Sequence, residues 1–129
     1  MLFHIVDDQP FFCTYMEGVL DSLGHESIPF TSPEDYITYI ESPELRMADA
    51  VFCDIRMPVM SGYEVMNRTL EIHPDKKFVL MSGGLEIRAQ YEPGVYRLLR
   101  KPLNLGELEE LIQELMMLRC VRLRPVNLL

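Results

Sequence analysis

The hydrophobic and polar residues of this chain form two kinds of segment that alternate along the sequence. Short apolar runs rich in Val, Ile, Leu and Phe are too brief for typical helices, and most of them end in polar or turn residues. They cover residues 2–6, 27–30, 50–53, 78–81 and 96–99. This pattern predicts five β-strands.

The segments between these runs have helical spacing. The first carries apolar residues that share one helix face, at Phe12, Met16, Val19, Leu20 and Leu23. Pro10 suits the first turn of this helix and Gly24 suits its end. A helix is therefore predicted between the first two strands.

Further helices are indicated by capping residues. Ser32-Pro33 and Ser61-Gly62 are typical helix starts, and Asn104 precedes a last helix with a Leu-rich face. A short helix is also predicted over residues 85–92, between two glycines and a Pro-Gly pair.

Strands that alternate with helices indicate an α/β fold built from parallel βαβ units. The simplest arrangement at this length is a doubly wound, five-stranded parallel sheet of order 2-1-3-4-5, flavodoxin-like, with helices on both faces and a short or irregular fourth helix. In such sheets a ligand binds beyond the carboxyl ends of the strands, where the winding reverses. Here that point lies between the first and third strands.

The length of 129 residues corresponds to one domain, and the chain has 12 Lys and Arg against 20 Asp and Glu, a net charge of −8. All 20 acids lie in residues 1–118, with nine of the basic residues. This acidic segment is expected not to bind nucleic acid directly. Residues 119–129 contain Arg119, Arg122 and Arg124 and no acid, and are interpreted as a tail or linker.

The cysteine count and the short apolar runs bear on location. Three cysteines without a CxxC motif favour a reducing cytoplasm over a disulfide scaffold. No run of apolar residues approaches the roughly 20 needed to span a membrane, so no membrane segment is expected.

Acidic residues follow two of the predicted strands. Asp7 and Asp8 follow the first and Asp54 follows the third, and these strands are neighbours in the predicted order. Carboxylates so close together repel one another and require a compensating positive charge. Mg²⁺ prefers oxygen ligands of this kind, which predicts a magnesium site with Asp7 and Asp8 as its best-placed ligands.

Two further residues at strand ends complete the candidate site. Ser82 follows the fourth strand and offers a hydroxyl, and Lys101 follows the fifth and offers a positive charge. A cation, an ammonium group, a hydroxyl and a spare carboxylate suit phosphoryl transfer. Asp54, at the end of a rigid apolar strand, is the best candidate for a nucleophile that forms an aspartyl phosphate.

The chain resembles the receiver domain of two-component response regulators, a CheY-like superfamily, over nearly its whole length. The resemblance rests on five motifs in the same order: Ile5-Val6-Asp7-Asp8, Val51 to Pro58, Ser61-Gly62, Met81-Ser82-Gly83 and Arg100-Lys101-Pro102.

The resemblance implies a role for each motif. Asp54 would accept a phosphoryl group from a sensor histidine kinase or phosphotransfer protein, and Lys101 and Ser82 would contact that group. Asp7, Asp8, Asp54 and the backbone carbonyl of Arg56 would bind Mg²⁺. The Lys–Pro bond would often be cis, and the phosphorylated domain would switch its contacts with a protein target or output domain. Such a domain is not expected to be an enzyme.

The sequence departs from the family pattern near its fifth strand. Leu98 stands where the family usually has a switch aromatic; Tyr96 lies two residues earlier, and strand alternation would direct it to the same side. The segment from Ser82 to Lys101 is short, and Arg56 is expected to lean over the acidic crevice.

Two other functions stay open at this stage. One is a pseudo-receiver, an interaction module that works without phosphorylation. The other is a phosphatase like the haloacid dehalogenases, which would place an acid/base aspartate where this chain has Arg56.

Overall fold

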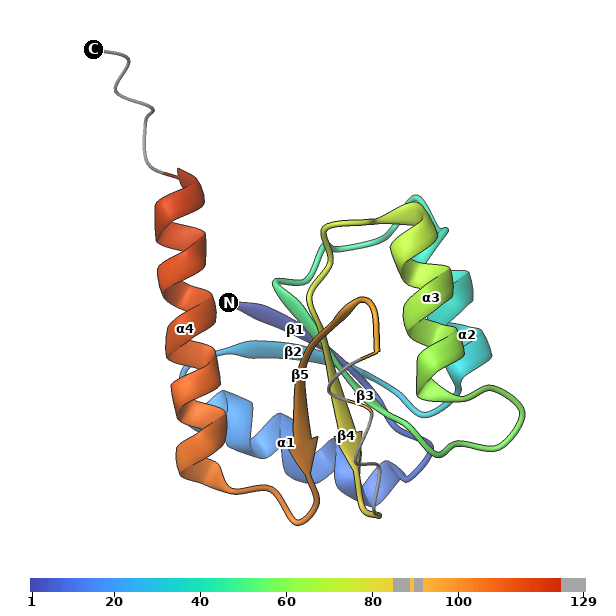
Figure 1. The fold of residues 1–129 in the computed structure, drawn as a ribbon, viewed down its shortest axis with the longest axis horizontal. Helices are drawn as coiled ribbons and strands as arrows, with labels where there is room; N and C mark the ends of the chain where they lie inside the picture. Colours follow the sequence, from blue (N-terminus) through green and yellow to red (C-terminus); the bar gives the residue numbers. More distant parts are fainter. Residues whose placement is uncertain (85–88, 90–91, 124–129) are drawn as a thin grey trace.

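The computed structural model describes residues 1–84, 89 and 92–123. Its strands form one parallel sheet of order β2-β1-β3-β4-β5, which confirms the predicted α/β fold (Figure 1). The elements are β1 (Leu2–Val6), α1 (Pro10–Ser22), β2 (Glu26–Phe30), α2 (Pro33–Ile40), β3 (Ala50–Asp54), α3 (Gly62–Ile72), β4 (Phe78–Ser82), β5 (Val95–Arg100) and α4 (Leu105–Leu123). The helix predicted over 85–92 lies largely outside the described residues.

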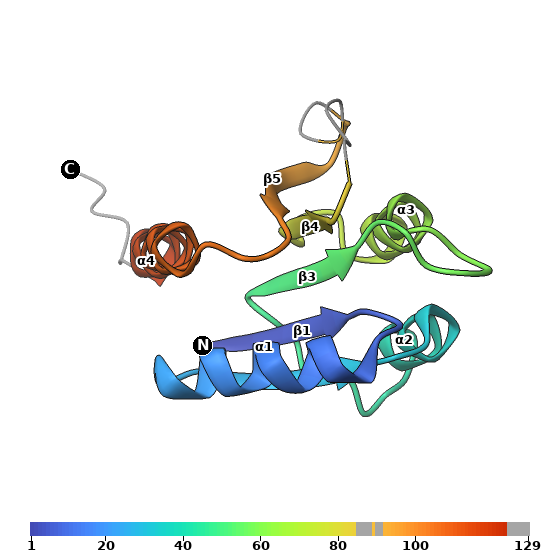
Figure 2. The same ribbon diagram turned by 90° about the horizontal axis from the view of Figure 1, so that it is seen from below.

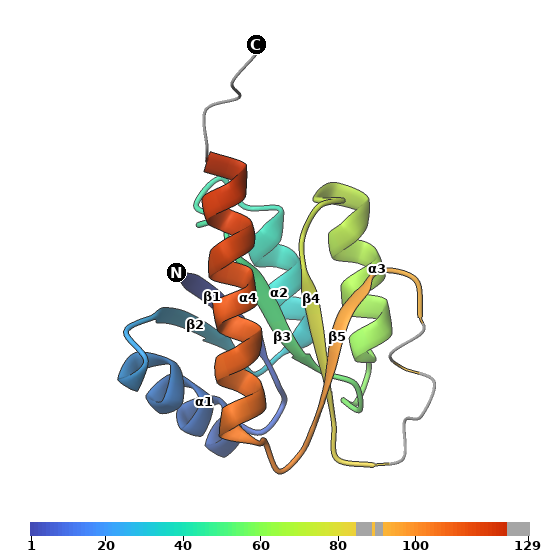
Figure 3. The ribbon, with the colours of Figure 1, turned by 60° about the vertical axis from the view of Figure 1, so that its left-hand side comes forward.

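Helices cover both faces of the sheet. One apolar cluster joins α1 and α4 to the sheet through residues such as Met16 and Leu111, and the other joins α2 and α3 through Tyr36 and Met66. In Figure 2, α4 lies on one side of the sheet and α2 and α3 on the other, and Figure 3 shows α4 in front of the strands. The strands β3 and β4 between these layers are fully buried, which explains their unbroken apolar sequences.

The predicted helix starts are confirmed by hydrogen bonds. The hydroxyl of Ser32 accepts from the backbone N–H of Asp35, and that of Ser61 accepts from the N–H of Glu64. The side chain of Asn104 likewise accepts from the N–H of Glu107 at 3.0 Å. Each bond satisfies an N–H that has no partner inside its helix.

Helix α4 continues past Leu118 into the segment that the sequence indicates as a tail or linker. The helix runs to Leu123, because no proline or glycine interrupts the chain before Pro125. Arg119 pairs with Asp49 at 3.6 Å, which attaches this extension to the residue that precedes β3. No helix among the described residues is long and apolar enough to cross a membrane.

An irregularity in β5 reverses the expected direction of Tyr96. Phe78 pairs with Val95 and Val79 with Arg97, so Tyr96 is an extra residue in the ladder. As a result Tyr96 packs in the cluster of α1 and α4, whereas Leu98 packs in the cluster of α2 and α3. The expectation that both side chains share a side was therefore wrong.

The tyrosine is held by charged neighbours on its own side of the sheet. Its hydroxyl donates to Glu114 of α4 at 2.8 Å, and the guanidinium of Arg97 lies 4.6 Å from its ring centroid. Glu114 lies on α4, on the face of the sheet opposite the cluster that contains Leu98, so Tyr96 does not replace the missing aromatic.

A buried histidine makes the stability of this fold pH-dependent. His4 is 1% exposed, its Nε2 donates to the carbonyl of Arg46, and its Nδ1 accepts from the Tyr36 hydroxyl, both at 2.9 Å. Burial lowers the pKa of His4 from 6.5 to about 4. The unfolded chain therefore binds a proton more readily, and stability present above pH 6.5 is lost as the pH falls towards 4.

We expect the free energy of unfolding to drop by about 2 kcal/mol from this group between pH 7 and pH 5. Chemical denaturation at the two pH values measures it, with His4→Gln as the control that cannot titrate. The same drop in the Gln variant would assign the pH dependence to other groups.

Candidate functional site

Three carboxylates meet beyond the carboxyl ends of β1 and β3. These strands are hydrogen-bonded neighbours, so Asp7 and Asp8 lie beside Asp54. One oxygen from each of the three side chains lies within 4.8 Å of the others. Asp7 is fully buried, Asp54 is 8% exposed and Asp8 is half-buried. The predicted convergence is therefore present, and its hard oxygen donors suit Mg²⁺.

Lys101 supplies the positive charge of this crevice. Its Nζ lies 2.6 Å from Oδ2 of Asp7 and 3.3 Å from Oδ1 of Asp54. The side chain of Lys101 is 18% exposed, so these contacts are only weakly screened by solvent. The peptide bond between Lys101 and Pro102 is cis, as the family resemblance implied.

Burial is the main influence on the Asp54 carboxyl group. It raises the pKa of Asp54 above its ordinary value, the ammonium of Lys101 opposes this shift, and the neighbouring charge of Asp7 adds to it. The ionised form of Asp54 is thus costly in the crevice, and a bound cation would lower that cost.

Ser82 is oriented by the backbone that follows it. This residue ends β4 and is 3% exposed; its hydroxyl accepts from the N–H of Gly84 at 3.2 Å and lies 3.3 Å from the Gly84 carbonyl oxygen. The β-ladder also holds it, since the N–H of Lys101 donates to its carbonyl at 2.7 Å. The hydroxyl therefore has a local partner that it must leave before it contacts a group on Asp54.

Arg56 extends from the loop after β3 towards the same backbone. A Cβ atom built on Gly84 would lie 3.6 Å from its Nη2, so its guanidinium lies beside the segment that holds Ser82. The predicted role of the Arg56 backbone carbonyl as a metal ligand stays a prediction.

The sequence predicts that Gly62 begins a helix. In the structure Gly62 also packs against the backbone of Asp54. A Cβ at this position would lie 2.3 Å from the Asp54 carbonyl oxygen and 2.9 Å from the Ile55 Cα atom. Its N–H donates to the Ile55 carbonyl at 2.9 Å. The start of α3 thus packs directly on the backbone that places Asp54.

We expect the free energy of unfolding of a Gly62→Ala variant to be about 2 kcal/mol lower than that of the wild type, because the new methyl group must displace backbone atoms. Chemical denaturation measures this loss. Gly18→Ala is the matched control, since no atom lies within 4 Å of its added Cβ, and it should be neutral or stabilising. An unchanged stability of Gly62→Ala would contradict the close approach.

Phe12 contacts the site, although its place in the apolar helix pattern predicts only a packing role. The Nζ of Lys101 lies 3.9 Å from the centroid of its ring, a cation–π contact. The apolar helix pattern explained Phe12 completely, so nothing in the sequence signalled this second contact.

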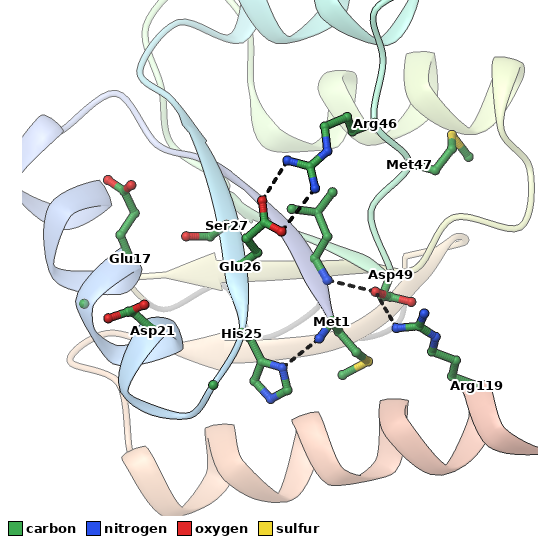
Figure 4. Close-up of a pocket in the computed structure, with 13 residues that line it drawn as sticks. Met1, Glu17, Asp21, His25, Glu26, Ser27, Arg46, Met47, Asp49 and Arg119 are labelled. Carbon is green, nitrogen blue, oxygen red and sulfur yellow. Dashed lines mark hydrogen bonds and ion pairs between the residues drawn. The ribbon is translucent and has the colours of Figure 1, made fainter.

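A cavity of about 1130 Å³ lies at the other end of the sheet, where β1 and β2 begin (Figure 4). Both arginines that line it pair with acids: Arg46 binds Glu26 at 2.7 Å, and Arg119 pairs with Asp49, which also accepts from the N–H of Leu2. The acidic crevice at the carboxyl ends, not this cavity, therefore brings together the groups suited to phosphoryl transfer.

Comparison with known proteins identifies the family. A family model described as the response regulator receiver domain matches residues 3–113. The chain belongs to the response regulator receiver domain family. Receiver domains of this family act as signalling switches of two-component systems and not as classical enzymes, and they generally bind Mg²⁺ at an acidic pocket.

Individual relatives agree with this assignment. The receiver domain is 24% identical over 113 residues to the transcriptional regulatory protein ZraR of Salmonella typhimurium, covering 85% of this chain and 25% of ZraR. It is 28% identical over 79 residues to the autoinducer 1 sensor kinase/phosphatase LuxN of Vibrio campbellii, covering 61% of this chain and 9% of LuxN. It thus spans about a quarter or less of the length of these relatives.

A solved structure shows the same fold. A response regulator receiver domain protein from Clostridium thermocellum superposes with a TM-score of 0.83 at 19% identity, over 95% of this chain and 98% of that one.

Proposed function

We propose that this receiver domain accepts a phosphoryl group on Asp54 from a sensor histidine kinase or a phosphotransfer protein, and that it does so with Mg²⁺. The observation that supports this proposal most strongly is the meeting of three carboxylates and Lys101 in one crevice. The metal ligands would be Asp7, Asp8, Asp54 and the Arg56 carbonyl. A bound Mg²⁺ would supply positive charge to the phosphoryl oxygens.

The chemistry assigned to the protein groups is a nucleophilic displacement. A carboxylate oxygen of Asp54 attacks phosphorus, the bond between phosphorus and the donor imidazole breaks, and the electron pair leaves with the imidazole. Lys101 already lies 3.3 Å from Asp54 and is placed to neutralise charge on the transferred group. Asp54 is the last residue of β3, which is buried along its whole length, and this holds the nucleophile in a fixed position.

The transferred group would then act as a switch. It carries about −1.5 to −2 charges at pH 7, in place of the single charge of the Asp54 carboxylate, beside Ser82 and Lys101. Lys101 would exchange its contact with Asp7 for one with the phosphoryl oxygens, and Ser82 would exchange its bonds with Gly84. Both residues border β4 and β5, so their movement would change the protein contacts made from that side of the domain.

The partners are proposed to be proteins. Residues 1–118 hold all 20 acids, which opposes direct binding to nucleic acid, and residues 119–129 are proposed to be a C-terminal tail or linker. The cysteines Cys13, Cys53 and Cys120 are free thiols, which supports a reducing, cytoplasmic setting.

Incubation with acetyl phosphate and Mg²⁺ tests the proposal without knowledge of the cognate kinase. We expect the intact protein to gain the mass of one phosphoryl group, to lose it in hydroxylamine as acyl phosphates do, and to gain none when EDTA removes the metal. Uptake that is equal in EDTA would contradict the magnesium site.

A further inference from the structure

We infer that Phe12 is a positioning residue for Lys101, because its ring face holds the lysine ammonium against the acidic crevice during phosphoryl transfer. The inference rests on the proposed function, since Lys101 is the group that Phe12 acts through. It adds a role for α1 that neither the family match nor the acidic motif contains.

The ammonium of Lys101 has two kinds of partner. Its Nζ lies 2.6 Å from Asp7 and 3.3 Å from Asp54. It also lies 3.9 Å from the centroid of the Phe12 ring, well inside the roughly 6 Å over which a ring face attracts a cation. The ring and the carboxylates therefore both hold the ammonium in a position that contacts the phosphoacceptor.

The ring itself is fixed by its surroundings. Phe12 is 8% exposed, belongs to the core cluster that joins α1 and α4 to the sheet, and lies near the N-terminus of α1. Its centroid lies 6.0 Å from that of Tyr15, one helical turn later. Phe11, the preceding residue, is 81% exposed and is not part of this cluster.

A fixed ring face matters because the other partners of Lys101 change during the reaction. The contact with Asp7 must give way when the ammonium turns to a phosphoryl group on Asp54, whereas the ring carries no charge to be neutralised. The ring continues to attract the cation while this exchange takes place. We expect the attraction to favour the transfer step and not the initial binding of the phosphodonor.

Fluorinated phenylalanines separate this attraction from packing. Fluorine atoms withdraw electrons from the ring and weaken its hold on a cation, with little change in shape. We expect site-specific incorporation of mono-, di- and trifluorophenylalanine at position 12 to lower the maximal rate of phosphorylation by acetyl phosphate stepwise, by about 3- to 10-fold in all. The acetyl phosphate concentration that gives half the maximal rate should stay unchanged.

The same series at Phe11 is the matched control and should leave the rate unchanged. In Phe12→Leu the rate should fall, and in Phe12→Tyr it should return to near the wild-type value. A second readout needs no activity: in NMR spectra, the methylene protons next to the Lys101 ammonium should be shifted upfield by the ring and should lose this shift in Phe12→Leu.

The outcomes distinguish this inference from the proposed function. Wild-type protein that takes up no phosphoryl group would overturn the function, and the NMR shift would still test the contact. If the wild-type protein takes up the phosphoryl group but fluorination at position 12 leaves the rate unchanged, the positioning role alone would be overturned. An unshifted Lys101 methylene signal would overturn the contact itself.

Discussion

An Asp54→Asn variant is expected to take up no phosphoryl group from acetyl phosphate, while the wild-type domain takes up one. The amide has nearly the size of the carboxylate but lacks its nucleophilic oxygen. Since burial raises the pKa of Asp54, its charge is costly in the folded state, and the Asn variant should be at least as stable as the wild type. Loss of uptake would then reflect lost chemistry and not unfolding.

Intact-protein mass spectrometry measures the uptake and thermal denaturation measures the stability. The exposed residue Asp75 provides a control, since Asp75→Asn removes one acid far from the crevice and should be labelled normally. Undiminished labelling of Asp54→Asn would move the acceptor to another residue.

A Lys101→Met variant is expected to lose about 3 kcal/mol of stability in the absence of divalent metal, because it leaves a buried carboxylate without its counter-charge. Asp7 is fully buried, and its closest cation is the Lys101 ammonium at 2.6 Å. Addition of Mg²⁺ should restore part of the loss, since the metal would supply the missing charge to the same carboxylates.

Denaturant unfolding with and without Mg²⁺ measures both effects. Lys77→Met is a matched control: Lys77 also lies over an aromatic ring, at 5.0 Å from the Tyr96 centroid, but it lies at the other end of the sheet. The stability lost in Lys77→Met should be small, and Mg²⁺ should not change it. A Lys101→Met protein as stable as the wild type would show that the ion pair with Asp7 carries no net stabilisation.

The acidic crevice was predictable because few sheet orders suit five strands that alternate with helices. Once β1 and β3 are neighbours, the residues at their carboxyl ends must meet at one edge of the sheet. The strand order alone therefore predicts that Asp7, Asp8 and Asp54 lie close together. Lys101 was predictable for the same reason, as the residue that follows β5. Local signals such as the Ser32 and Ser61 caps also sufficed, because they act over three residues.

Features that depend on exact register or on contacts between distant elements were not predictable. The extra residue in β5 sends Tyr96 to the face opposite Leu98, and simple alternation cannot detect it. The approach of Gly62 to Asp54 depends on how α3 packs on the end of β3. The apolar spacing of α1 predicts a core role for Phe12 whether or not a lysine lies above its ring.

Chemical trapping of the phosphorylated residue tests the central claim most directly. Borohydride reduces an aspartyl phosphate to homoserine, and peptide mass spectrometry then locates the reduced residue. After treatment with acetyl phosphate and Mg²⁺, we predict homoserine at position 54 and unmodified aspartate at positions 7 and 8. Homoserine at either of those two positions, or at an acid outside the crevice, would contradict the assignment of Asp54 as the phosphoacceptor.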